Sequence, residues 1–214
     1  MALGLVGLGI VVGLTAEAAL ARPLGRARVG GGRPQGAEAA AERLATDGVR
    51  ALLSLGVCGG LDPTLKPGAL VTPRTVLVDG CIYATDAALS IALGGYTIDR
   101  LLSRSEVVAA ASEKARLFAT TGAAAVDLES GAVARVAMRH GLPFAVLRAV
   151  CDPAHGDLPP AARAALDADG SVAFARLMIS IARRPGQLPR LVQLASEAAA
   201  ARQALVRRVR QLCE

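Results

Sequence analysis

Two carboxylates at the ends of apolar runs are the residues best placed to do acid–base chemistry. Glu129 follows the run that begins at Gly122, and Asp152 ends the run that begins at Pro143. Apolar runs of this length are typical of buried strands, and in an open parallel sheet the residues that leave the carboxyl ends face the ligand crevice. Pro153 keeps Asp152 extended, because proline disfavours helix at the preceding residue. We therefore expect both acids to face one site.

Spacing alone allows a second interpretation of the same two acids. One would be an acid at a helix N-terminus and the other an acid at a strand end, each stabilised by local dipoles without any catalytic role. A glycine pattern near the start, Gly7, Gly9 and Gly13, imitates a dinucleotide-binding motif. Those glycines precede and bracket a strand instead of following it into a helix, which argues against a Rossmann site.

The elements that must position these acids alternate between strands and helices. We predict strands at 10–12, 50–57, 69–78, 123–126 and 143–150, and helices at 35–46, 113–120 and 128–140, the last ended by Gly141. The stretch 80–105 shows no clear period and is expected to be irregular, and 153–160 is expected to be a loop followed by short helices. The pattern predicts one α/β domain over 1–214, with a mostly parallel mixed sheet flanked by helices.

Composition narrows the class of protein. Hydrophobic residues make up 53% of the 214 residues but aromatic residues only 2%, so the core is expected to consist of small side chains, and base-stacking nucleic-acid binding is excluded. The four cysteines and two histidines show no metal-ligand spacing, so we expect no metal and a reduced, cytoplasmic thiol set. The apolar start lacks a basic n-region and is interpreted as a strand, not a signal peptide.

Basic charge is concentrated at the C-terminal end. The net charge is +6, and residues 183–214 carry seven arginines against two glutamates. Apolar residues from Leu188 to Leu212 recur every three or four positions, which predicts a basic amphipathic helix. Two roles are open for it: packing its apolar stripe on protein, or peripheral contact with an anionic membrane at the inner face.

Several sequence blocks occur together in an order typical of a known family. They are Val12-Gly-Leu-Thr-Ala-Glu17, Gly31-Gly-Arg-Pro-Gln-Gly-Ala37, the glycine-rich segment from Gly56 to Gly68, Val126-Asp-Leu-Glu-Ser130 and Arg148-Ala-Val-Cys-Asp152. In these blocks the chain resembles the nucleoside phosphorylase and methylthioadenosine/S-adenosylhomocysteine nucleosidase superfamily. Its tail, at 183–189 and 199–205, is most similar to the hopanoid-associated branch, the adenosylhopane nucleosidase or phosphorylase.

The resemblance implies a role for each acid. Asp152 matches the family acid that protonates purine N7, and Glu129 matches the glutamate that binds the ribose hydroxyls. Glu17 matches the glutamate that activates the attacking water, with a register that also allows Ala18. This division suits the reaction, because breaking a ribosyl C–N bond leaves positive charge on the sugar and negative charge on the base. Asp152 would need a pKa raised by burial or by a neighbouring carboxylate.

The resemblance also implies the residues that bind the substrate. Arg148 matches an arginine near the nucleophile, although a buried arginine paired to one of the acids is the alternative. Val107 and Val108 match the segment whose backbone holds the purine, although valines in a strand usually belong to the core. Gly59 and Leu128, in the matching blocks, complete the expected set.

The nucleophile is water or phosphate. Family phosphorylases hold phosphate with an arginine at the position of Ser54 and with a serine or threonine at the position of Val57. Because this chain has neither residue at its position, water is favoured as the nucleophile. Arg22, Arg33 and Arg148 could still form another anion site, so phosphate as a co-substrate stays open, and no other cofactor is expected. Cys151 is expected to be a buried thiol, not a nucleophile.

The expected function is removal of adenine from a 5′-substituted adenosine, with adenosylhopane in hopanoid biosynthesis as the specific substrate. The alternatives are a purine nucleoside phosphorylase and a nucleoside-binding sensor without turnover. The resemblance further implies a homodimer.

Overall fold

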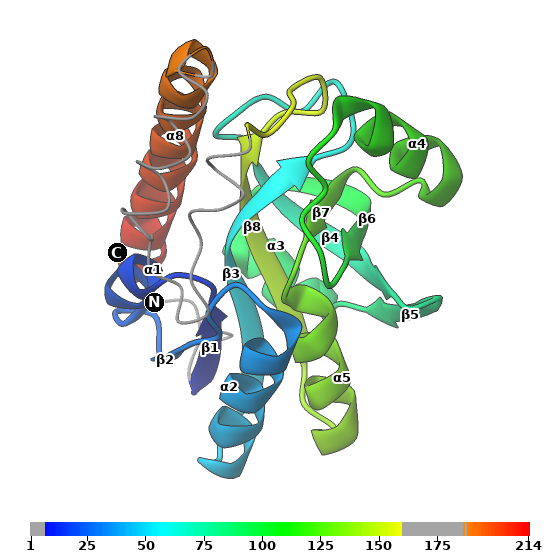
Figure 1. Cartoon of the computed structure of the whole chain (residues 1–214). Coiled ribbons are helices and arrows are strands. Elements are labelled where there is room, and N and C mark those ends of the chain that lie inside the picture. Colours follow the sequence, from blue (N-terminus) through cyan, green and yellow to red (C-terminus); the bar gives the residue numbers. More distant parts are fainter. Residues whose placement is uncertain (1–6, 160–185, 187) are drawn as a thin grey trace.

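The computed structural model describes residues 7–159, 186 and 188–214, which form a sheet flanked by helices (Figure 1). The strands in this part of the chain are β1 (Leu8–Val12), β2 (Arg26–Val29), β3 (Ala51–Gly60), β4 (Leu70–Val78), β5 (Cys81–Ala84), β6 (Tyr96–Ser103), β7 (Ala125–Asp127) and β8 (Phe144–Asp152). The helices are α1 (Thr15–Ala21), α2 (Pro34–Thr46), α3 (Ala87–Leu93), α4 (Ala111–Thr121), α5 (Ser130–His140) and α8 (Leu188–Cys213). The predicted short helices after the 153–160 loop lie outside the described residues.

The sheet is mixed and partly closed. The expectation that both acids leave the carboxyl ends of parallel strands assumed an open sheet. β3 pairs with β8 in parallel and with β7 in antiparallel, β7 pairs with β6, β6 with β4, and β4 returns to β8. These five strands therefore form a closed circuit of pairings, from which β1 and β2 extend at β3 and β5 extends at β4.

Closure of the circuit brings the two predicted acids together at Gly59. This glycine pairs with Asp152 of β8 on one side and with Val126 of β7 on the other. Glu129 follows β7 by two residues, so it emerges near the end of β8 although β7 runs antiparallel to β3. The expectation of a shared site holds, but through sheet closure and not through parallel strand ends.

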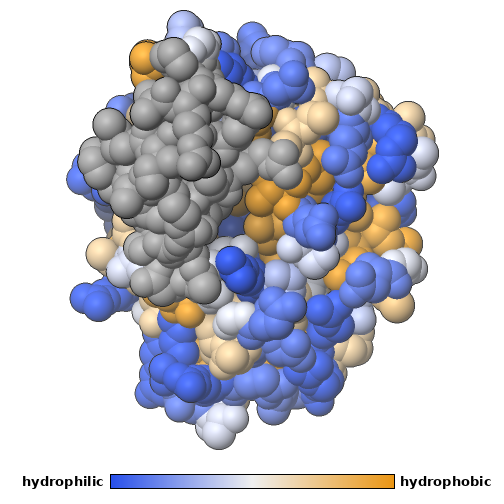
Figure 2. Space-filling view, viewed as in Figure 1, coloured by the Kyte–Doolittle hydropathy of each residue, from blue (hydrophilic) through white to orange (hydrophobic). Residues whose placement is uncertain are grey.

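Two apolar layers hold the sheet between its helices. Side chains alternate along β8: Val146 and Val150 pack with α2 and α5, whereas Ala145 and Leu147 pack with α1, α3 and α8. This is the period-2 alternation of a strand buried on both faces. The side chains in these layers are mostly Ala, Val and Leu, as the composition predicts. On the surface shown in Figure 2, apolar residues gather near the middle of the molecule and are surrounded by largely hydrophilic residues.

Several elements escaped the sequence prediction. The stretch 80–105 contains β5, α3 and β6, and α3 begins at an ordinary N-cap, where Asp86 accepts a hydrogen bond from the Leu89 amide at 2.8 Å. The first half of β6 is mostly exposed and the second half is buried, so no single hydrophobic period runs through it. Val107 and Val108 lie in the connection between β6 and α4, not in a strand. The predicted helix end at Gly141 is confirmed by its left-handed φ of 61°.

The C-terminal helix α8 has two different halves. Its second half packs on the sheet through buried Ala201, Leu205, Val209 and Leu212. Its first half carries apolar residues that are exposed or half-buried, and these line the cavity described below. Figure 1 shows α8 standing beside the sheet, away from α2 and α5. Within the described residues, no helix combines the length and apolarity needed to cross a membrane.

Candidate active site

A cavity of about 1020 Å³ opens where β3, β7 and β8 end. All eight site residues predicted from the sequence line it: Glu17, Gly59, Val107, Val108, Leu128, Glu129, Arg148 and Asp152. They come from five different parts of the chain, and residues 31–35, which join the loop before α2 to its first turn, line the cavity on a further side. The structure therefore gathers the whole predicted set in one place.

Glu129 is a buried carboxylate with fixed surroundings. Its Oε1 accepts a hydrogen bond from the Gly32 amide at 3.2 Å, and its Oε2 lies 3.5 Å from Nη2 of Arg148. Gly13 and Gly30 make room for it, because a Cβ on either would lie 2.8 Å from a Glu129 oxygen. Burial raises the pKa of Glu129 to about 7, although the Arg148 guanidinium opposes the rise.

Arg148 joins the acids from inside the sheet. It is 1% exposed, and its Nη2 lies 2.7 Å from Oδ2 of Asp127 and 2.6 Å from Oγ of Ser54. Asp127 also accepts a hydrogen bond from the Ser130 hydroxyl at 2.5 Å. Arg148 lines the cavity and is also a buried arginine paired to an acid, most closely to Asp127.

Glu17 faces Arg148 across Gly56. Its Oε2 accepts hydrogen bonds from the backbone amides of Gly13 at 3.1 Å and Leu14 at 2.9 Å. A Cβ on Gly56 would lie 2.5 Å from Nη1 of Arg148 and 3.0 Å from Oε1 of Glu17, so glycine is needed for these two groups to approach. Burial raises the pKa of Glu17, with the Leu14 amide opposing. Glu17 lines the cavity and the alternative Ala18 does not.

Asp152 ends β8 beside a lysine that sequence reasoning did not find. The Lys114 ammonium of α4 donates to its Oδ2 at 2.5 Å, and Nη2 of Arg190 on α8 lies 3.7 Å from its Oδ1. Burial raises the pKa of Asp152, and the hydrogen bond and charge of Lys114 oppose the rise. The raised pKa of Asp152 agrees in direction with the expectation of an acid kept protonated by burial. The surroundings of Asp152 at the end of β8 are not purely apolar, because they include Lys114 and Arg190.

Asp127, Ser54, Lys114 and Arg190 are the site residues that sequence reasoning missed. Asp127 lies within a matching block, two residues before Glu129, and its place in that block is the signal that points to it. Lys114 is 38 residues from Asp152 in the sequence, and no local spacing links the two.

The rest of the cavity wall is largely apolar. Val57, Val126, Leu128 and Leu158 line it near the acids. On a further side it is lined by the first half of α8, through Leu188, Leu191, Val192, Leu194, Ala195 and Ala198. The arrangement is a carboxylate-rich end joined to an extended apolar wall.

The Cys151 thiol lies in the cavity wall. Burial raises the pKa of Cys151 to about 12, so its thiol stays protonated and is a poor nucleophile. The described part of the chain holds no group of three or more His, Cys, Asp or Glu side chains arranged to bind a metal ion.

The family model described as Phosphorylase superfamily matches residues 25–86 and 75–184 of the chain. No curated protein matches it. Among solved structures, a 5′-methylthioadenosine/S-adenosylhomocysteine nucleosidase from Neisseria meningitidis in complex with methylthio-immucillin-A is similar at a TM-score of 0.65 and 17% identity, over 94% of this chain and 96% of that chain.

Two further structures show the same likeness. The corresponding nucleosidase from Colwellia psychrerythraea, in complex with adenine, has a TM-score of 0.64 and 17% identity over 81% of this chain and 93% of that chain. A futalosine hydrolase mutant of Helicobacter pylori has a TM-score of 0.64 and 16% identity over 82% and 98%. These likenesses confirm the predicted fold.

Proposed function

The chain belongs to the phosphorylase superfamily, and from this premise we propose that it is an enzyme that cleaves the N-glycosidic bond of a 5′-substituted adenosine and releases adenine. One observation carries the proposal: Glu17, Glu129 and Asp152 share one cavity, with Arg148 between the first two. A site for this reaction needs a proton donor for the base and negative charge near the sugar.

Each acid takes one role in the proposed reaction. Asp152 protonates N7 of the departing purine, and its raised pKa supports a protonated form. Glu129 binds the ribose hydroxyls and stabilises the cationic sugar, and Glu17 takes a proton from the attacking water. Arg148 keeps both glutamates oriented. Gly59, Val107, Val108 and Leu128 form the walls against which the nucleoside packs.

Water is the proposed nucleophile. Ser54, at a position where family phosphorylases hold phosphate, is buried and already bound to Arg148, and Val57 has no hydroxyl. Arg22 is exposed and does not line the cavity. Arg33 does line it, so phosphorolysis stays as the second candidate function, and phosphate is the one co-substrate considered.

The apolar wall supports a large apolar 5′ substituent, and we propose adenosylhopane in hopanoid biosynthesis as the substrate. The cavity volume, about 1020 Å³, lies just above the range of about 300–1,000 Å³ for small-molecule sites. A methylthio group would leave most of the α8 wall uncovered, whereas a long hydrocarbon would cover it and gain from burial.

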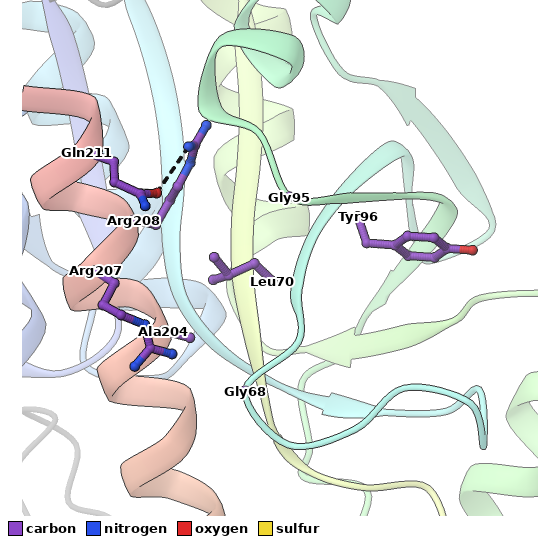
Figure 3. A pocket seen from close by; sticks show the side chains of 8 residues that line it. All are labelled: Gly68, Leu70, Gly95, Tyr96, Ala204, Arg207, Arg208 and Gln211. Carbon is purple, nitrogen blue, oxygen red and sulfur yellow. Dashed lines mark hydrogen bonds between the residues drawn. The ribbon is translucent and has the colours of Figure 1, made fainter. Parts of the chain in front are cut away.

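Membrane contact, a homodimer and a cytoplasmic location are part of the same proposal. So is a single domain over 1–214, with the basic tail expected over 183–214, which contains α8. Arg202, Arg207 and Arg210 of α8 are exposed, and each basic residue near an anionic lipid surface adds about 1 kcal/mol of attraction. Arg208 is engaged differently: it donates to the Leu93 carbonyl at the end of α3, beside a hollow of about 350 Å³ (Figure 3).

A mass-spectrometric assay tests the function. Free adenine is measured from methylthioadenosine, S-adenosylhomocysteine and adenosylhopane, with and without phosphate. We expect release from adenosylhopane to be fastest and independent of phosphate. Asp152→Asn should lower the rate about 10²–10⁴-fold, while Asp99→Asn, whose side chain is 95% exposed, should not. Absence of adenine from all three substrates would leave the sensor as the better interpretation.

A further inference from the structure

Lys114 is a fully buried cation that does not line the cavity. Its side chain is 0% exposed, and Nζ donates to Asp152 Oδ2 at 2.5 Å, to the Pro153 carbonyl at 3.0 Å and to the Gly156 carbonyl at 2.8 Å. An ammonium has three N–H groups, so all of its donors are used inside the protein. Lys114 therefore does not contact a substrate itself and acts through the groups that it binds, of which Asp152 is the one that lines the cavity.

The two oxygens of Asp152 have different surroundings. Oδ2 is bound to Lys114, whereas Oδ1 is buried and has no hydrogen-bond partner among the described residues. Nη2 of Arg190 lies 3.7 Å from Oδ1 and is itself without a hydrogen bond among the described residues. A buried carboxylate oxygen without a partner is costly, and in a binding site it is free to bind a ligand.

The position of Lys114 also holds the loop that follows β8. The two carbonyls that it binds belong to this loop, and the loop is fastened to the start of α4 a second time, where Asp157 accepts a hydrogen bond from the Ala111 amide at 2.7 Å. Because the ammonium is held from three directions, Oδ2 of Asp152 is held too, and the carboxylate cannot rotate freely.

We propose that Lys114 is a positioning residue that holds Asp152 by Oδ2 and leaves Oδ1 to hand the proton to the departing base. This rests on the proposed function. In the step, the C–N bonding electrons go to the purine, the proton on Oδ1 moves to N7, and Asp152 becomes a carboxylate whose new charge is stabilised by the Lys114 ammonium. Asp152 is thereby a stronger acid than burial alone would make it.

The other charged groups around Asp152 differ from Lys114. Arg190 and Glu197 face it from α8, and they are paired with each other through Nη1 and Oε1 at 3.2 Å. Their charges act on Asp152 in opposite directions, Arg190 lowering its pKa and Glu197 raising it. Burial raises the pKa of Cys151, the residue before Asp152, to about 12, so its thiol stays neutral. Lys114 is therefore the cation whose removal should matter most.

The test compares Lys114→Met with Lys66→Met, which changes the other lysine of the sequence at an exposed position. Activity requires protonated Asp152, so it falls as the pH rises through the pKa of that acid. This fall is the alkaline limb of the pH profile of kcat. Loss of the cation should move the alkaline limb to a pH that is higher by roughly 1–3 units. It should lower kcat at least about 10-fold, with a smaller change in KM.

Two further measurements make the outcome decisive. Lys114→Arg retains the cation, so its alkaline limb should stay near that of the wild type; a limb displaced upward as far as in Lys114→Met would overturn the proposal. A carboxyl ¹³C NMR titration of the ligand-free protein, with the Asp152 signal assigned by Asp152→Asn, should show the Asp152 titration moved upward in Lys114→Met.

The NMR titration separates failure of this inference from failure of the proposed function. If the wild type releases no adenine, the proposed function fails and the titration alone decides the role of Lys114. An Asp152 titration that is unmoved in Lys114→Met, or a kcat and alkaline limb equal to those of Lys66→Met, would show that Lys114 is only a structural ion-pair partner.

Discussion

The carboxylate of Asp127 lies 2.7 Å from the guanidinium of Arg148, and each side chain is 2% exposed. This pair is the closest contact of Arg148 with an acid, closer than its 3.5 Å contact with Glu129. Asp127 therefore neutralises much of the charge of Arg148. Glu129 can then face the cavity with its pKa near neutrality instead of being held fully ionised by the arginine.

Replacing Asp127 with Asn should destabilise the fold. Removal of one partner leaves the buried Arg148 charge poorly compensated, and we expect a loss of about 3 kcal/mol in the free energy of unfolding. Urea denaturation measures this loss. The matched control is Asp47→Asn, because Asp47 pairs with Arg28 at the exposed surface at 3.0 Å, and its loss should cost less than about 1 kcal/mol. Equal stability of the two variants would contradict the prediction.

The stability of the protein should depend on the protonation of Glu129. Its pKa is about 7 in the folded protein and 4.5 in the unfolded chain, so the folded state binds more protons between these values. The free energy of unfolding therefore falls as the pH rises from 4.5 through 7, by about 3 kcal/mol from this residue. Glu129→Gln should remove that part of the slope. Unfolding measured at several pH values would show it, and parallel curves for the two proteins would refute it.

Gly56→Ala should inactivate the enzyme while leaving most of its structure intact. The added Cβ would lie 2.5 Å from Nη1 of Arg148, which is held by Asp127 and Ser54 and cannot move aside cheaply. Displacement of Arg148 or Glu17 by about 1 Å could lower kcat/KM about 10²-fold. The control is Gly186→Ala, since no atom of the residues that the structure describes lies within 4 Å of a Cβ there. Adenine release and circular dichroism of both variants test the prediction, and a Gly56 variant with wild-type activity would disprove it.

Val192→Asp should reduce preference for apolar 5′ groups. Val192 lines the cavity wall formed by α8, and a carboxylate there would oppose burial of a hydrocarbon chain. We expect kcat/KM for adenosylhopane to fall about 10-fold or more, with little change for methylthioadenosine. Ser196→Asp adds the same charge to the same helix at an exposed position that does not line the cavity. If both substrates lose activity equally, the α8 wall does not bind the 5′ group.

Strand positions were predicted well from the sequence where a strand is buried along its whole length. β3 and β8 are buried almost throughout, so their apolar runs are long and visible, and their predicted positions differ from the observed ones by a few residues. β6 passes from the surface into the core, and β2 is a short strand with two arginines, so neither has a pattern that local periodicity detects. Membership of the superfamily was also predicted correctly, because the matching blocks keep their order along the chain.

By itself, the sequence determined the α/β class and the placement of Glu129 and Asp152 at strand ends, since both follow from local patterns of apolar and polar residues. The tertiary structure decided which groups surround each acid. Sheet closure placed the ends of β7 and β8 on either side of Gly59, and it brought Lys114 to Asp152 across 38 residues of sequence. The pKa of a carboxyl depends on its desolvation and on the charges within a few ångströms, and both exist only once distant segments have packed together.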